Sequence, residues 1–319
     1  MKQAIKFIFK PRLRAVILTL LLSGNILAQP DTLSFLHITD THIISDLDFY
    51  HPGIAERRNH YGQGIIPLQQ FIATVPKETN CDFITLTGDM IDFFEGQESD
   101  GEMLDFQIER FSRYIDECQV PIFMTLGNHD IVSYGWQDDK GVWSQKIAGR
   151  AQAAWSRNIE CFRDGTYYSR QYEVSGNKYR LIFLYNGYNS FNPEEGIITP
   201  FPGRQQLHWL EYQIQQAEDD TEIIFMHIPI RRALKGEKPF SELYTVLAKY
   251  PSVKLIVAGH NHINAIQELP SAGNTKITQV QTGAFGRSIE NWRLIKLTGD
   301  QILVSFPGRT EKEISIPAK

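Results

Sequence analysis

The chain has 319 residues, 42% of them hydrophobic, and a formal net charge of −5. This length allows one large hydrophobic core or two small ones, and the negative charge excludes a general attraction for nucleic-acid backbones. We therefore expect no nucleic-acid partner, and we interpret the densest basic spots, Arg57–Arg58 and Arg231–Arg232, as solvated faces or contacts close to a phosphate.

Residues 1–28 have the pattern of a cleaved secretory signal peptide. Five basic residues precede the short apolar run at 15–22, which is below the ~20 residues that span a bilayer, and small residues at the end suit cleavage after Ala28. We expect the mature chain, residues 29–319, to form a single domain, to be exported to a periplasm or out of the cell, and to lack a stable membrane anchor. An uncleaved signal anchor is the alternative. Cleavage would change the net charge to −10, because the leader has five Lys/Arg and no Asp/Glu.

The first part of the chain predicts three strands separated by loops and helices. Each strand is a short β-rich run, the pattern of a strand that is covered on both faces. In chain order we expect a strand at 33–39, a loop at 43–63, a helix at 65–75, a strand at 82–87, an amphipathic helix at 102–117 and a strand at 121–126.

Residues 131–165 predict an inserted loop–helix segment that is rich in tryptophan. Trp136, Trp143 and Trp155 could form an aromatic wall for a substrate, or they could pack the insertion itself.

The remaining elements alternate between strands and helices. Ser175-Gly176-Asn177 between two β-rich runs is typical of a hairpin. The expected elements are hairpin strands at 167–174 and 178–185, helices at 204–218 and 240–250, and strands at 222–226, 253–258, 276–282, 291–298 and 301–306.

Three cysteines are too few for a disulfide scaffold. Cys81 and Cys118 each precede an apolar strand, so they could form a bridge if those strands are neighbours; buried free thiols are the alternative, for Cys161 as well.

Five polar motifs each follow the carboxyl end of a predicted strand. In open α/β sheets the binding site lies beyond those strand ends, so the motifs should meet at one edge of the core. The motifs are Asp40-Thr41-His42, Gly88-Asp89-Met90-Ile91-Asp92, Gly127-Asn128-His129-Asp130, His227 and Gly259-His260-Asn261-His262. Carboxylate, amide and imidazole groups in this proportion suit Zn, Fe or Mn better than Ca or Mg, and Asp89 has two oxygens with which to bridge two ions.

The other histidines carry less information. We expect His37 to be an ordinary strand residue and His208 to lie on a helix surface. His51 and His60 fall in the long loop after the first motif, where they are ordinary loop residues or, alternatively, reach a substrate.

The order and spacing of the five motifs resemble those of the calcineurin-like metallophosphoesterases over residues 33–298. The resemblance implies a four-layer α/β/β/α sandwich, with two mixed sheets flanked by helices. It also implies a dinuclear centre of two divalent transition metals (Mn, Fe or Zn). One metal would be bound by Asp40, His42, Asp89 and His262, and the other by Asp89, Asn128, His227 and His260.

The resemblance also implies two catalytic residues that bind no metal. His129 would contact the phosphate and stabilise the transition state or protonate the leaving oxygen, and Asp92 would orient its ring. A hydroxide that bridges the metals would attack phosphorus in line.

Differences between this chain and the motifs of known subfamilies narrow the range of expected activities. Asp92 stands where purple acid phosphatases have Tyr, and Phe93-Phe94 replaces the Arg-Gly of protein phosphatases. Residues 35–42 are similar to the opening of bacterial cyclic-nucleotide phosphodiesterases and of sphingomyelinase-like enzymes. We expect hydrolysis of a phosphodiester or phosphomonoester of a small molecule or lipid headgroup, with the diester slightly favoured. A non-catalytic binding protein on the same scaffold is the alternative.

Overall fold

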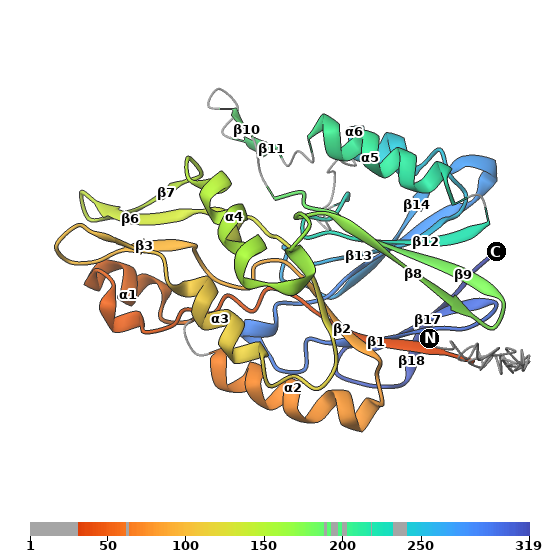
Figure 1. Ribbon diagram of the computed structural model, residues 1–319, viewed down its shortest axis with the longest axis horizontal. Helices are drawn as coiled ribbons and strands as arrows, with labels where there is room; N and C mark the ends of the chain where they lie inside the picture. The colour runs from red at the N-terminus through yellow and green to blue at the C-terminus, as the bar shows by residue number, and fades with distance from the viewer. Residues whose placement is uncertain are drawn as a thin grey trace, which may run out of the picture.

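Two six-stranded mixed sheets form the centre of the protein (Figure 1). The computed structural model describes residues 31–61, 64–187, 190–192, 197–199, 203–217, 219–231 and 241–319. The expected signal peptide at 1–28, Arg232 and parts of the segment between residues 187 and 203 lie outside these ranges. Within them, no helix is long and apolar enough to cross a bilayer.

The first sheet has the order β18-β17-β16-β1-β2-β5. Strands β1, β2 and β5 are parallel to one another, whereas β16 to β18 are antiparallel to their neighbours. The bounds are Leu33–Ile38 for β1, Phe83–Thr87 for β2, Ile122–Thr125 for β5, Arg293–Leu297 for β16, Gln301–Ser305 for β17 and Lys312–Pro317 for β18. The parallel strands therefore end at one edge of the sheet, where the first three polar motifs begin.

The second sheet has the order β14-β15-β13-β12-β9-β8. Its four central strands are parallel and both edge strands are antiparallel. The bounds are Tyr168–Val174 for β8, Asn177–Phe183 for β9, Asp220–Phe225 for β12, Val253–Ala258 for β13, Ala265–Pro270 for β14 and Lys276–Gln281 for β15.

The side chains of β12 show how the layers are built, since they alternate between two hydrophobic cores. Ile223 and Phe225 belong to the core between the sheets, where Phe225 packs against Phe35 of β1 with ring centroids 5.6 Å apart. Ile224 and the following Met226 pack instead under α5 (Arg204–Gln215) and α6 (Ser241–Leu247). Helices α2 (Ile65–Thr79) and α3 (Gln107–Ile115) lie on the opposite side of the molecule (Figure 1). The expected four-layer α/β/β/α sandwich is confirmed.

A smaller four-stranded sheet extends beyond the carboxyl ends of β1 and β2 (Figure 1). Its order is β4-β3-β6-β7, and it lies beside α1 and α4. The bounds are Pro52–Arg58 for α1, Glu95–Gln97 for β3, Met103–Leu104 for β4, Ser133–Gln137 for β6, Lys140–Ser144 for β7 and Ala148–Asn158 for α4. The remaining elements are the short pair β10 (Ser190–Asn192) and β11 (Ile197–Thr199) and five 3-10 turns at Leu47–Phe49, His129–Ile131, Glu160–Phe162, Ala272–Asn274 and Phe285–Arg287.

Three sequence-based expectations were wrong, all around this smaller sheet. The loop at 43–63 contains α1, which starts at Pro52 and is capped by His51, whose Nδ1 accepts the N–H of Gly53 at 3.1 Å. The helix at 102–117 begins only at Gln107, because residues 103–104 form β4. The insertion at 131–165 holds a β-hairpin, β6–β7, before its helix, and the left-handed backbone at its turn suits the twist of the two strands. Strands β14 and β18 were also missed.

All three cysteines are free thiols, so the alternative of a bridge between Cys81 and Cys118 is not realised. Cys81 and Cys161 are buried, whereas Cys118 is half-buried.

Glu222 makes the stability of the second sheet depend on pH. It is fully buried in the middle of β12, and neither carboxylate oxygen has a hydrogen-bond partner among the described residues, so burial raises its pKa to about 7. A carboxyl whose pKa is raised on folding favours the folded state below its ordinary pKa and loses that contribution as the pH rises towards 7. We expect Glu222→Gln to raise the free energy of unfolding by on the order of 2–3 kcal/mol at pH 8 and to change it little at pH 5.

Denaturant unfolding at both pH values, at one fixed metal concentration, checks this. Glu173→Gln is the matched control, because Glu173 is exposed on β8 of the same sheet. An equal effect of Glu222→Gln at pH 5 and pH 8 would contradict the assignment.

Candidate metal centre

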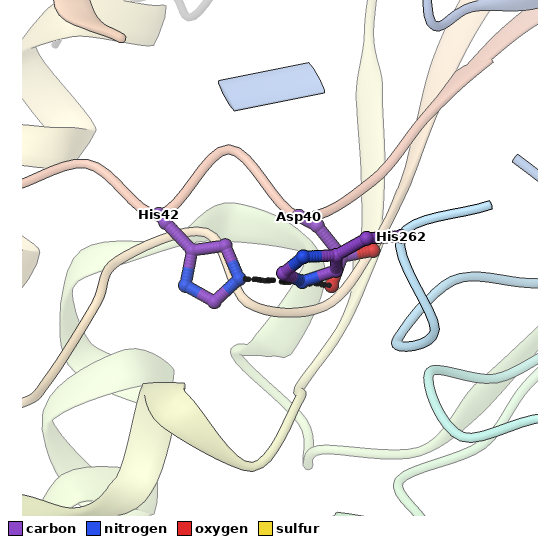
Figure 2. A group of neighbouring side chains, drawn as sticks. All are labelled: Asp40, His42 and His262. Atoms are coloured by element: carbon purple, nitrogen blue, oxygen red, sulfur yellow. Dashed lines mark hydrogen bonds and ion pairs between the residues drawn. The ribbon is translucent and has the colours of Figure 1, made fainter. Parts of the chain in front are cut away.

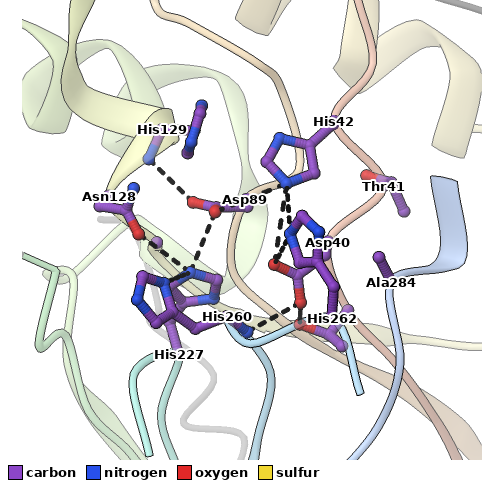
Figure 3. Close-up of polar contacts among 12 residues, drawn as sticks. Asp40, Thr41, His42, Asp89, Asn128, His129, His227, His260, His262 and Ala284 are labelled. Carbon is purple, nitrogen blue, oxygen red and sulfur yellow. Dashed lines mark hydrogen bonds and ion pairs between the residues drawn. The ribbon is translucent and has the colours of Figure 1, made fainter. Parts of the chain in front are cut away.

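All five polar motifs meet where the two large sheets end (Figure 3). Loops after β1, β2, β5, β12 and β13 supply every residue that the sequence singled out for metal binding or catalysis. Three groups of His and Asp side chains lie close enough to share a cation: Asp40, His42 and His262; Asp89, His227 and His260; and His42, Asp92 and His129. That the ligands bind metal stays a prediction.

The backbone at this edge is unusual. Five of the seven predicted ligands have a left-handed backbone conformation, with φ between 45° and 70°: Asp40, His42, Asp89, His260 and His262. Side chains avoid this region at a free-energy cost of about 1–2 kcal/mol per residue. Such conformations persist where the surrounding structure imposes them, and they gather at functional sites.

Two glycines allow the loops to come together. Gly88 also has a positive φ of 84°, and a Cβ there would lie 2.6 Å from the ring of His227. A Cβ on Gly127 would overlap the carboxylate of Asp89. Both positions require glycine because the ligand side chains take up the space.

The first group consists of Asp40, His42 and His262 (Figure 2). Asp40 Oδ1 lies 3.2 Å from His262 Nε2 and 3.7 Å from His42 Nε2. The other oxygen, Oδ2, accepts hydrogen bonds from the Thr39 hydroxyl and the His260 N–H, at 2.7 and 2.9 Å. Oδ1 is buried and has no hydrogen-bond partner among the described residues. A carboxylate oxygen that faces two imidazole nitrogens is a donor set that fits a divalent cation.

The second group surrounds the carboxylate of Asp89 (Figure 3). Asp89 Oδ2 lies 3.0 Å from His227 Nε2 and, on its other side, 3.7 Å from His42 Nε2 of the first group. His227 Nε2 is also 3.2 Å from Asn128 Oδ1 and 3.3 Å from His260 Nδ1. Oδ2 of Asp89 therefore faces both groups, as a bridging ligand must.

Hydrogen bonds fix which nitrogen of each imidazole faces the site. Nδ1 of His227 donates to the Thr87 carbonyl oxygen at 2.7 Å, and Nδ1 of His42 donates to Asp92 Oδ1 at 3.0 Å. In the neutral ring the proton then sits on Nδ1 and the lone pair on Nε2, the atom that faces the carboxylates.

The charges of the site favour cations. Burial alone would raise the pKa of Asp40, but contacts with His262 and His42 hold that pKa well below its usual range. Burial alone would lower the pKa of His227, but the charge of Asp89 raises it to about 9. Without metal, protons on the histidines therefore balance the carboxylates, and a divalent ion would replace those protons.

Asp92 orients two histidines at once. Its buried carboxylate makes a bidentate salt bridge to Arg58, with Nε–Oδ2 at 2.6 Å and Nη2–Oδ1 at 2.5 Å. Oδ1 also contacts Nδ1 of His42 and lies 3.4 Å from Nδ1 of His129. His129 Nδ1 donates mainly to the main-chain oxygen of Asp92, at 2.8 Å. Because Arg58 occupies this carboxylate, the third group is a positioning network and fits a metal poorly.

Arg58 is the functional residue that the sequence did not reveal. We interpreted the Arg57–Arg58 pair as solvent-facing or close to a phosphate. For Arg58 the first alternative was wrong, because its side chain is 13% exposed and faces inward from α1. The second alternative stays a prediction. Its guanidinium lies over the rings of Tyr61, Tyr134 and Trp143, at 4.7, 5.8 and 5.4 Å from their centroids.

Asp130 holds the backbone of two motif loops. Its carboxylate accepts the N–H groups of Asp89 at 2.8 Å, Gly127 at 2.7 Å and Ile91 at 3.1 Å. Burial and the charge of Asp89 raise the pKa of Asp130 to about 7. Trp155 donates its indole N–H to the Asp130 carbonyl at 2.8 Å. For this tryptophan the structure therefore favours packing of the insertion over a wall for a substrate.

The remaining histidines belong to none of the three ligand groups. His37 is buried in β1 between Thr87 and Thr282, where burial lowers its pKa to about 3, and His208 is exposed on α5. His51 caps α1 and His60 is exposed.

A family model for calcineurin-like phosphoesterases matches residues 33–264, which is more than half of the chain. The chain belongs to the calcineurin-like phosphoesterase family. Its geometry agrees with a family whose members act on phosphate esters at a dimetal centre.

Curated relatives and solved structures of the family are distant. The chain is 22% identical over 246 residues to a manganese-dependent ADP-ribose/CDP-alcohol diphosphatase from Arabidopsis thaliana, covering 64% of this chain and 72% of the relative. It is 20% identical over 289 residues to a 3′,5′-cyclic-nucleotide phosphodiesterase from Nostoc sp., covering 84% and 89%. A dimetal phosphatase from Danio rerio superposes with a TM-score of 0.59 at 14% identity, covering 91% of this chain and all of that one, which shows the fold.

The bridging position of Asp89 predicts the result of one substitution. Asp89→Asn keeps the shape but replaces a charged oxygen with a neutral amide between the two groups. We expect the bound metal to fall well below two ions per chain, because both sites lose the same ligand. Elemental analysis after dialysis against a limited Mn or Zn concentration measures this.

Asp164→Asn, at an exposed position, is the control and should keep the full metal content. Two ions retained by Asp89→Asn at unchanged affinity would rule out the bridging role.

Proposed function

We propose that the protein hydrolyses phosphate esters of small molecules or lipid headgroups and that it acts on diesters in preference to monoesters. One observation carries this proposal: Asp89 Oδ2 faces two separate groups of ligand side chains, while the N–H of His129 donates to the other oxygen, Oδ1, at 2.8 Å. The carboxylate of Asp89 thereby connects both ligand groups to His129, the residue that we place next to the phosphate.

The residues of the site have two chemical roles: seven are predicted to bind the metals, and His129 is predicted to act on the substrate. Two divalent ions, when bound by the seven predicted ligands, supply a water that is activated near neutral pH and positive charge opposite the phosphate oxygens. His129 is not needed as a ligand, and at 19% it is the most exposed of the three side chains that contact Asp92. It is therefore free to meet the substrate.

The hydrogen bond from Nδ1 of His129 to the Asp92 carbonyl leaves Nε2 as its reactive atom. In hydrolysis the bond between phosphorus and the leaving oxygen breaks, a bond from phosphorus to the oxygen of water forms, and one proton of that water is lost. The proton that the water loses passes to the solvent. His129, when protonated on both ring nitrogens, gives its Nε2 proton to the leaving oxygen and so completes the leaving alcohol. Asp92 and Arg58 hold the ring in place throughout.

The preference for diesters rests on the curated relatives. One relative is named a cyclic-nucleotide phosphodiesterase and the other a diphosphatase. Both activities break a P–O bond at a phosphorus that is linked through oxygen to two groups. We further propose that the protein is exported, which rests on residues 1–28 alone.

His129→Ala separates metal binding from proton transfer. We expect both metals to remain bound and turnover to fall by ~10²–10⁴, the typical contribution of a positioned proton-transfer group. The measurements are metal content and the rate on bis-p-nitrophenyl phosphate and p-nitrophenyl phosphate.

His208→Ala, on the exposed face of α5, is the control and should keep both metals and full activity. Loss of metal in His129→Ala would contradict its assignment, and faster hydrolysis of the monoester by the unchanged protein would contradict the diester preference.

A further inference from the structure

Of the three tryptophans in the insertion, Trp143 lies beside the proposed reaction. Its ring centroid is 5.0 Å from that of His129, and the two rings are nearly perpendicular at 84°. Yet Trp143 is 42% exposed, whereas Trp155 is fully buried and Trp136 stacks on His51. A large aromatic side chain that is exposed to solvent beside a proposed catalytic residue is well placed to contact a ligand.

The ring of Trp143 is held in a fixed orientation. It packs against the fully buried Tyr134, directly across the β6–β7 hairpin, with centroids 4.3 Å apart. The Arg58 guanidinium lies 5.4 Å from its centroid and is itself anchored by Asp92. Trp143 is therefore supported from behind by the same network that orients His129, so its position is coupled to that of the reacting group.

We propose that Trp143 forms the wall of the leaving-group subsite and that the substrate carries a planar aromatic group on that side of the phosphate. This inference rests on the proposed function, because the role of His129 locates the leaving oxygen. A group attached to that oxygen extends past His129, and the neighbouring surface is an indole. Indole faces bind planar rings by stacking, which is worth ~1–3 kcal/mol per base in nucleic-acid complexes.

Nucleotides and aryl esters both carry such a ring. Two pairs of competitors distinguish them: adenosine 5′-monophosphate against ribose 5-phosphate, which lacks the base, and phenyl phosphate against cyclohexyl phosphate, which has a non-planar ring of similar size. Each pair keeps the phosphate and changes only the group that would meet Trp143.

Binding of the four compounds to the metal-loaded protein is measured by calorimetry. We expect the planar member of at least one pair to bind about 5- to 100-fold more tightly. Trp143→Ala should abolish that ratio without weakening the non-planar member, and Trp143→Phe should keep most of it. Val142→Ala is the control, because Val142 is exposed on the same strand and faces the other side of the hairpin.

A preference in the nucleotide pair alone identifies a nucleotide subsite, and one in the aryl pair alone identifies an aryl-ester subsite. Equal binding within both pairs, or an equal loss of planar and non-planar ligands in Trp143→Ala, would overturn the proposal. The test does not need turnover: a protein that discriminates these ligands but hydrolyses no ester would refute the proposed function and leave the aromatic wall in place.

Discussion

The rest of the structure depends on one constraint: hydrogen bonds between the loops at the sheet edge must hold the ligand residues in a strained backbone conformation. Five ligand residues adopt left-handed backbone conformations that an isolated chain would avoid. Main-chain hydrogen bonds between the loops hold them there: the N–H of Asp40 donates to the Gly88 carbonyl at 3.0 Å, and that of His42 donates to the Asp89 carbonyl at 2.9 Å. The two parallel strands β1 and β2 therefore continue their pairing into the site.

The same edge concentrates charges that would destabilise a folded protein if they were left unpaired. Asp40, Asp89 and Asp92 are buried, and in each case histidine contacts keep the pKa low. Arg58 and Asp130 complete the arrangement from behind, one as a cation that fixes a carboxylate and the other as an acceptor for three backbone N–H groups. The result is a rigid set of donor atoms, which a metal site needs in order to fix coordination geometry.

The large sheets and the position of the site could be predicted from the sequence because the signals are local. Apolar runs mark the parallel strands, and each run is followed at once by its polar motif, as at Thr87 and Asp89. The contacts of Arg58 could not be predicted, since they join a seven-residue helix to a loop 34 residues further along the chain. Likewise, the sequence presents Trp143 and Trp155 as equivalent, and only packing decides which of them is exposed.

The central claim is that two metals lie on either side of one carboxylate oxygen, and anomalous X-ray diffraction from crystals of the metal-loaded protein tests it most directly. The account predicts two peaks, one among Asp40, His42 and His262 and one among Asn128, His227 and His260, with Asp89 Oδ2 between them. A single peak, or peaks outside these residues, would contradict it.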